Sequence, residues 1–168
     1  MVGRSKSGKT SVTEYIIGSL VSRGFRVGAI KHTDKDIELD CAGKDSFRLR
    51  KAGASVVALS SSKRITLFQE LDSGLPPEEI AGKFMSDVDL VITEGHKNSS
   101  ALKIEITGNS DTEEPLFMTD NRIIAVISDR DISTVSIPLF RFRDIERVTE
   151  FIIKKVKLIQ PHRVKKSG

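Results

Sequence analysis

The stretch Gly3-Arg4-Ser5-Lys6-Ser7-Gly8-Lys9-Thr10 follows the pattern G-x-x-x-x-G-K-T and decides the fold. The two glycines of this pattern let the backbone curl, so that its N–H groups point at an anion. Lys9 reaches the β- and γ-phosphates of a nucleotide, and the hydroxyl of Thr10 is a ligand for Mg²⁺. A helix that begins here adds partial positive charge. We therefore predict a phosphate-binding loop whose contacts are Gly3, Arg4, Ser5, Lys6, Ser7, Gly8, Lys9, Thr10 and Ser11.

The segment before this loop is short. A phosphate loop normally follows a buried strand of about five residues, and only Met1 and Val2 precede it. We hypothesise that residues upstream of Met1 are missing. The alternative is a stub of two residues, in which case helix packing and bound phosphate would hold the loop.

Composition places the chain among soluble globular proteins. Its 168 residues are 38% hydrophobic and 30% charged, which fits one domain over residues 1–160 followed by a basic tail over 161–168. No apolar run approaches the length of a membrane span, and no signal peptide is visible. The single cysteine, Cys41, has no partner for an internal disulfide. We therefore expect a cytoplasmic protein without a membrane partner.

The net charge of +4 fits an anionic ligand but does not argue for nucleic acid. Basic residues are scattered outside the tail, and few aromatic residues are available to stack on bases. Nucleic acid is therefore not an expected partner.

The order of elements predicts an α/β fold. Strands are expected at 25–30, 55–60, 64–69, 88–94, 101–107, 122–128 and 136–142, and helices at 10–23, 46–51, from Pro77 and at 144–159. This alternation predicts a mostly parallel sheet with helices on both faces, including strands 25–30, 55–60, 88–94 and 122–128. The polar-apolar alternation of 101–107 favours an edge or antiparallel strand, and Pro138 favours an edge position for 136–142.

Glu94 ends the predicted strand 88–94 and is the first candidate beside the loop. A nucleotide–Mg²⁺ site needs an acidic group at the tip of a neighbouring strand, so Glu94 is predicted to act on the metal and in catalysis. The alternative is a glutamate that merely starts a loop. Asp89 begins the same strand and is discounted, because it would lie at the opposite edge of the sheet.

The polar segment 31–46 follows the second strand and is expected at the ligand-binding edge. Asp40 or Asp36 would hold Mg²⁺ through water or orient an attacking water. His32 would contact a phosphate or simply be solvated. Cys41 lacks partners at the spacing of a zinc site.

Asp129 and Asp131 follow the strand 122–128. A carboxylate there would accept hydrogen bonds from N1–H and the 2-amino group of guanine, which adenine lacks. A solvated loop aspartate is the alternative for both residues.

The stretches "GKDSFRLRKAGA" (43–54) and "DLVITEGHK" (89–97), together with the phosphate loop, the Lys-His pair at 31–32 and "KIEI", resemble the MobB family of molybdopterin guanine dinucleotide biosynthesis. The resemblance implies a P-loop NTPase-like fold that binds GTP and Mg²⁺, with feeble GTPase activity at most. It also implies a homodimer that works beside a MobA-like molybdopterin guanylyltransferase. It adds Asp40, Asp45 and His32 to the pocket, whereas "TDKD" replaces further histidines of the family.

Three functions are weighed. A GTP-binding accessory protein of molybdenum cofactor assembly is the leading interpretation. A small-molecule kinase would need an arginine-bearing lid, for which only Arg48 and Arg50 are available. A metallochaperone would need clustered His and Cys, and the three His and one Cys are widely separated.

Overall fold

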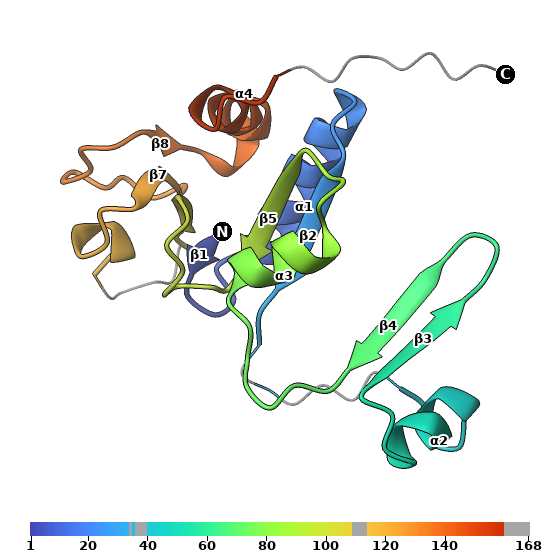
Figure 1. The fold of residues 1–168 in the computed structure, drawn as a ribbon. Helices are drawn as coiled ribbons and strands as arrows, with labels where there is room; N and C mark the ends of the chain where they lie inside the picture. Colours follow the sequence, from blue (N-terminus) through green and yellow to red (C-terminus); the bar gives the residue numbers. More distant parts are fainter. Residues whose placement is uncertain (34, 36–39, 109–113, 160–168) are drawn as a thin grey trace, which may run out of the picture. The chain divides into compact units, whose positions relative to one another are not determined.

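A computed structural model describes residues 1–33, 35, 40–108 and 114–159 of the chain (Figure 1). It divides into two compact units, Met1–His32 with Pro76–Gly168, and Thr33–Leu75. Each unit is described by itself. The predicted basic tail lies outside the described residues, so the division into one domain and a tail stays a prediction.

The first unit contains the parallel sheet. Four strands pair in the order β1-β6-β7-β8, all parallel: β1 (Val2–Gly3), β6 (Lys103–Ile106), β7 (Ile123–Ile127) and β8 (Leu139–Phe140). A second parallel pair is formed by β2 (Val27–Lys31) and β5 (Leu90–Glu94). The α/β class with a mostly parallel sheet is thus confirmed, as is the edge position predicted for 136–142, although the observed strand β8 begins one residue after Pro138.

Met1 joins the two groups of strands. Its backbone amine donates to the carbonyl of Thr93 at 2.6 Å, and its carbonyl accepts the N–H of Gly95 at 3.1 Å. On the other side, Val2 lies in register with Glu105 of β6. The stub is therefore bonded to strands on both sides and its side chains are buried. The expectation that such a stub would leave the loop held mainly by helix packing and bound phosphate is therefore wrong.

Two helices cover one face of this sheet. Helix α1 (Lys9–Ser22) and helix α4 (Ile145–Lys155) contribute apolar side chains to the same core as the strands. The fully buried members from the two helices are Ile16, Leu20 and Val148. Helix α4 ends earlier than the predicted residue 159. Asp144 is its N-cap residue, as predicted, but the carboxylate makes no capping bond to α4 and instead accepts the N–H of Arg141 in the short 3₁₀ turn η2 (Phe142–Asp144).

Helix α3 (Pro77–Phe84) begins with Pro77 in its first turn, as predicted. Met85, directly after α3, packs on Gly28 of β2, where an added Cβ would lie 2.9 Å from its sulfur. Because successive residues of a strand face opposite sides, this contact lies on the face opposite to Val27, which packs on the core of α1 and α4.

The second unit is a hairpin with one short helix. Helix α2 (Asp45–Lys51) precedes the antiparallel strands β3 (Val56–Ser60) and β4 (Ile65–Gln69). The prediction that 55–60 belongs to the parallel sheet is wrong. Only a short turn separates the two strands, with Ser61 bonded to Arg64 through main chain and side chain. A turn of this length pairs its strands antiparallel.

Strand β6 is central and parallel on both sides, so its prediction as an edge or antiparallel strand is wrong. Two charged residues made it look half exposed, but both are buried and satisfied. Lys103 donates to Asp120 at 2.6 Å and to the carbonyl of Lys97. Glu105 accepts the N–H groups of Leu116 and Phe117, which open the 3₁₀ turn η1 (Leu116–Met118).

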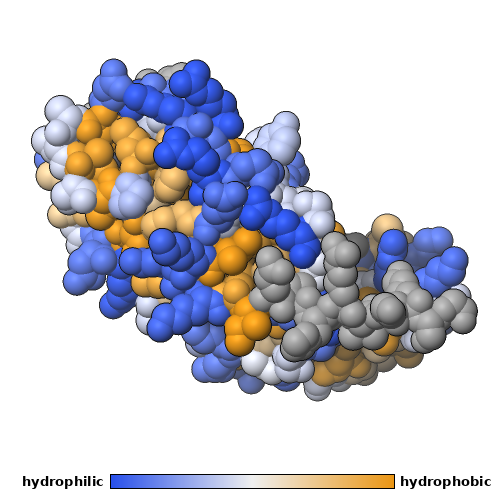
Figure 2. Space-filling model, turned by 90° about the horizontal axis from the view of Figure 1, so that it is seen from above, coloured by the Kyte–Doolittle hydropathy of each residue, from blue (hydrophilic) through white to orange (hydrophobic). Residues whose placement is uncertain are grey.

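Figure 2 shows apolar side chains reaching the surface between hydrophilic ones. Within the described part of the chain, no helix has both the length and the apolar character needed to cross a membrane.

Candidate functional site

The phosphate loop adopts the backbone that its glycines predict. Gly3 has φ +146°, and a Cβ there would lie 2.2 Å from the carbonyl oxygen of Ile106. Gly8 has φ +88° and is the N-cap residue of α1, its carbonyl accepting the N–H of Val12. At Gly3 both the contact and φ exclude any other residue, and at Gly8 the positive φ would strain any other residue. The loop thus runs from β1 straight into the positive end of α1.

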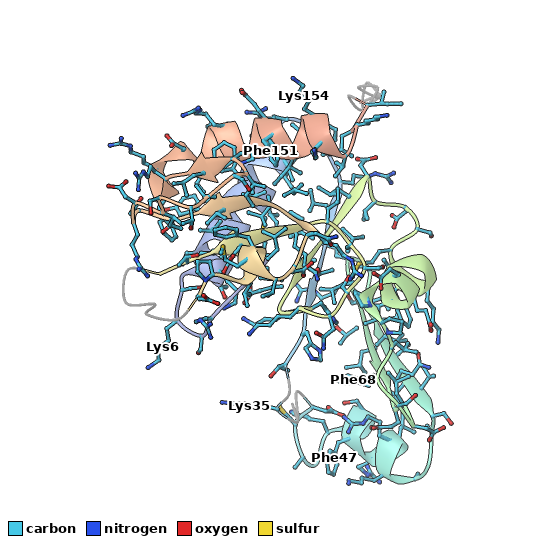
Figure 3. All side chains as sticks on the ribbon, turned by 90° about the vertical axis from the view of Figure 1, so that its left-hand side faces the viewer. Lys6, Lys35, Phe47, Phe68, Phe151 and Lys154 are labelled. Atoms are coloured by element: carbon cyan, nitrogen blue, oxygen red, sulfur yellow. The ribbon has the colours of Figure 1, made fainter. Side chains whose placement is uncertain are left out.

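The cations of the loop are arranged differently. Lys9 lies across the loop and donates to the carbonyl of Arg4. Arg4 itself reaches the carbonyl of Glu114 at 3.3 Å. Lys6 has φ +63° and is exposed, and Figure 3 shows its side chain directed away from the fold. Lys9 is therefore the loop cation whose ammonium is held by the loop's own backbone.

Ser7 is buried at the centre of the loop. Its hydroxyl has no hydrogen-bond partner among the residues that the structure describes. A buried polar group without a partner is uncommon. This orphan hydroxyl supports a loop built around a polar ligand.

A cavity of about 420 Å³ opens at the loop. It is lined by Ser5, Lys6, Gly8, Lys9, Thr10, Ser11 and Glu94. The structure therefore brings the predicted loop and the predicted acidic residue together at one cavity.

Glu94 and Thr10 meet at the edge of this cavity. The hydroxyl of Thr10 donates to Oε1 of Glu94 at 3.0 Å. The ammonium of Lys31 lies 3.3 Å from the same carboxylate oxygen and 3.4 Å from the hydroxyl. Lys31 and Glu94 end β2 and β5 and are register partners, which is why their side chains meet.

This donor set fits Mg²⁺. The metal prefers oxygen ligands and is usually held by only one or two protein side chains together with phosphates and water. In the described residues, no group of three or more His, Cys, Asp or Glu side chains is placed to hold one metal ion. Thr10 and Glu94 would supply the protein oxygens, and a cation already lies beside them in the form of Lys31.

His32 follows β2 and extends its pairing, donating its N–H to the carbonyl of Glu94 at 2.9 Å. Its ring stacks on His96, with centroids 4.6 Å apart. Burial, and secondarily the neighbouring His32, lower the pKa of His96 below its ordinary value of 6.5. Between them Gly95 has φ +96°, and an added Cβ would lie 3.1 Å from the carbonyl oxygen of His32, so that any other residue would be strained there. His32 is thus placed next to Glu94.

Asp129 follows β7 and accepts the N–H of Phe142 at 3.1 Å. The ring of Phe142 in turn lies 3.4 Å from the position of a Cβ on Gly8. Arg141 fastens the same segment to the carbonyl of Ser128. Asp129 is therefore linked through a single residue to the phosphate loop.

Asp40 and Asp45 belong to the second unit. Asp40 is buried, accepts a hydrogen bond from Ser46 at 2.7 Å and pairs with Arg50 at 3.5 Å. Asp45 begins α2, and its side chain is exposed beside Arg48. Their predicted roles at the phosphate stay predictions. Asp36, the alternative to Asp40, lies outside the described residues.

Sequence reasoning missed two residues of the site, Lys31 and Phe142. Lys31 lies one residue beyond the predicted strand 25–30, and a lysine there is commonly solvated. The signal would have been the pairing of β2 with β5, which places Lys31 opposite Glu94, and strand order is not readable from one sequence. Phe142 was predicted only as the last residue of the strand 136–142.

Known proteins share this architecture. The family model described as MobB, Molybdopterin guanine dinucleotide synthesis protein B, matches residues 1–129. The chain belongs to the MobB family. The resemblance inferred from the motifs is thereby confirmed.

Two relatives carry the name molybdopterin-guanine dinucleotide biosynthesis adapter protein. The one from Escherichia coli strain K12 is 33% identical over 157 residues, which cover 89% of this chain and 87% of the relative. The one from Haemophilus influenzae strain Rd is 31% identical over 153 residues, or 90% and 85% of the two chains.

Solved MobB structures have the same fold. The crystal structure of Bacillus subtilis MobB aligns with a TM-score of 0.70 at 23% identity, covering 91% of this chain and 93% of the other. A crystal structure of molybdopterin-guanine biosynthesis protein B aligns with a TM-score of 0.69 at 27% identity, covering 91% and 95%. The P-loop NTPase-like fold is therefore that of this chain as well.

Proposed function

We propose that this chain is a GTP-binding adaptor of molybdopterin guanine dinucleotide biosynthesis. The observation that carries the proposal is the Gly3–Thr10 loop, which meets Glu94 at one cavity in a chain of the MobB family. The names of the curated relatives support the adaptor role. The proposal includes a cytoplasmic location and weak GTPase activity at most, and the partner is a MobA-like guanylyltransferase.

GTP would be held by its phosphates. The N–H groups at the start of α1 and the ammonium of Lys9 would bind the β- and γ-phosphates. Mg²⁺, when bound, would screen the charge of the phosphates, and Thr10 and Glu94 would hold it. Phosphate binding of this kind does not distinguish GTP from ATP, so base selection must come from another part of the chain.

Asp129 is our candidate for base selection. One of its oxygens accepts the N–H of Phe142, and a carboxylate has further acceptor sites that would take the N1–H and 2-amino group of guanine. The Asp129→Asn variant would offer an amide donor instead, which fits the C2 carbonyl of xanthine. We expect it to lose affinity for GTP and gain affinity for XTP in equilibrium titrations, whereas an equal loss for both would leave Asp129 only the role of holding Phe142.

A homodimer is part of the proposal. In the register of the hairpin, Leu67 lies opposite Ala58 and Ile65 opposite Ser60, on the same face as Val56. Three large apolar side chains of this face are exposed, Val56 at 47%, Leu67 at 43% and Ile65 at 72%. The other face is where Val57 is buried. A second copy covering the exposed face would bury apolar area that the unit itself leaves in water.

The proposal is tested by nucleotide binding and partner capture together. We expect the chain to bind GTP more tightly than ATP in the presence of Mg²⁺, to hydrolyse it slowly in single-turnover assays, and to retain a purified molybdopterin guanylyltransferase in a pull-down. Fast phosphate transfer to a small acceptor would instead support a kinase. Absence of both GTP binding and guanylyltransferase capture would overturn the proposal.

A further inference from the structure

Lys31 contacts both candidate metal ligands. Its ammonium is 3.3 Å from Oε1 of Glu94 and 3.4 Å from Oγ1 of Thr10, and these two oxygens are 3.0 Å apart. A cation thus contacts both oxygens that the metal would use. The contact is built by the sheet, because the ends of β2 and β5 are in register.

We propose that Lys31 is the resident counter-cation of this pair in the nucleotide-free protein, and that its ammonium and a divalent metal exclude each other. The inference rests on the proposed function, which calls for the metal. Both cations use the same carboxylate oxygen, and like charges at this separation repel. Lys31 is therefore a positioning residue, because it holds Glu94 against Thr10 until the metal replaces it.

The difference in exposure decides which group moves. The side chain of Lys31 is 63% exposed, whereas that of Glu94 is 13% exposed. A lysine has a flexible stem that leaves a contact with little steric hindrance. Glu94 is confined beside α1 and has less freedom to follow. Exchange therefore occurs by withdrawal of Lys31, with the two oxygens remaining in place.

This arrangement predicts an order of binding. A metal that binds without nucleotide must displace the ammonium and gains only two protein oxygens as ligands. A metal that arrives with a nucleotide also keeps its phosphate ligands, and the phosphates give the released ammonium a new anionic neighbour. The protein would therefore take up the metal with the nucleotide and bind it poorly before.

The test measures metal binding without nucleotide, using Mn²⁺ as a paramagnetic substitute for Mg²⁺ and electron paramagnetic resonance to count free Mn²⁺. We expect the Lys31→Met variant to bind Mn²⁺ about tenfold more tightly than wild type, since the competing cation is gone. Lys31→Arg, which keeps the charge, should stay close to wild type.

Lys154→Met is the matched control, because it removes the same charge from α4. Lys154 lines a hollow with Arg23, at the end of α1 opposite to the phosphate loop, and Figure 3 shows Lys154 and Lys6 at opposite ends of the first unit. This variant should leave Mn²⁺ affinity unchanged. An equal gain in both variants would reduce the effect to net charge and overturn the inference.

A second substitution locates the gain. Adding Glu94→Gln to Lys31→Met should abolish the tighter Mn²⁺ binding, and persistence of the gain would overturn the inference, as would no gain in Lys31→Met. Titration of wild type with GTP is run in parallel. If wild type binds no GTP, the proposed function fails. The difference in Mn²⁺ affinity between wild type and Lys31→Met still decides whether Lys31 competes with the metal for the two oxygens.

Discussion

The two units of this chain differ in how far their apolar side chains are buried. In the first, side chains such as Ile16, Leu20 and Ile106 are fully buried between helices and the parallel sheet. In the second, Val57 is the most buried apolar side chain of the described part, while Ile65 and Leu67 of the same hairpin are exposed. The second unit instead buries a charged pair, formed by Asp40 and by Arg50 of α2.

This difference in burial suits the two units to different functions. A packed core gives the first unit the rigidity that a phosphate loop needs, because donors must be held in place before the ligand arrives. The second unit leaves apolar surface unburied, which is the property of a surface that contacts another protein. We therefore propose that the first unit binds nucleotide and the second contacts another protein, and the following variants test this proposal.

The largest effect is expected from Lys9→Ala. It removes the ammonium that lies across the loop, and we expect the affinity for GTP to fall at least about a hundredfold, as for a lost charge-assisted contact with phosphate. The melting temperature should change little, since the side chain is half-buried and belongs to no core. Calorimetric titration beside thermal unfolding checks both. Unchanged GTP affinity would remove the loop from the site.

The rigidity of the first unit depends partly on a buried ion pair. Lys103 is 4% exposed and is held by Asp120 and the carbonyl of Lys97. Asp120→Asn leaves a buried ammonium without its counter-ion, and we expect a loss of about 2 kcal/mol in the free energy of unfolding at neutral pH. Denaturant unfolding measures this loss.

The contribution of the Lys103–Asp120 pair to stability depends on pH. The hydrogen bond from Lys103 lowers the pKa of Asp120 below its ordinary value of 3.8. A carboxyl whose pKa is depressed by folding stabilises the protein above its unfolded pKa, and this contribution is lost as pH falls through the folded pKa. Wild type and Asp120→Asn should therefore converge in stability as the pH falls below 3.8 and passes through the lowered pKa of Asp120. Glu146→Gln is the control, since Glu146 is largely exposed beside Arg23 and its loss should be far smaller.

The same pair shows why parts of the fold were beyond the sequence. The phosphate loop, the parallel strands 25–30 and 88–94 and the first three helices follow from local patterns. Lys103 and Glu105, by contrast, gave β6 the pattern of a half-exposed strand, because the pattern cannot tell a solvated charge from one satisfied by distant partners. The apolar run 55–60 fits a core strand or a hairpin equally well, and only tertiary structure decides between them.

The protein-contact role of the second unit is tested at Ile65. Placing a charge on the exposed apolar face, as Ile65→Lys, should raise the dissociation constant of the dimer about tenfold or more, because a burial of this kind is lost. Analytical ultracentrifugation across a dilution series measures it. Thr66→Lys is the matched control, because Thr66 is also exposed but faces the other side of β4.

GTP affinity of Ile65→Lys should equal that of wild type. If Thr66→Lys dissociates the dimer equally, added charge rather than the apolar face is responsible. If neither variant changes the mass, the second copy does not lie on this face and the homodimer loses its structural support.

The smallest effect is expected at Asp40. The sequence predicts a catalytic role for this residue, whereas the comparison of the two units gives it only a structural one. The carboxylate of Asp40 is held by Ser46 and Arg50. Asp40→Asn keeps an acceptor for Ser46, and Arg50 keeps its contact with Glu70. We expect a loss of about 1 kcal/mol in the local stability of the hairpin, seen as faster amide hydrogen exchange in β3 and β4, and a change in single-turnover GTP hydrolysis of less than about twofold.

Asp45→Asn provides the reference for this measurement, since its exposed carboxylate contacts Arg48 in the same helix and should alter neither quantity. A fall in hydrolysis by Asp40→Asn that exceeds its effect on GTP binding, with exchange in the hairpin unchanged, would give Asp40 the catalytic role after all. The second unit would then take part in phosphate chemistry, and the division of work between the two units would not hold.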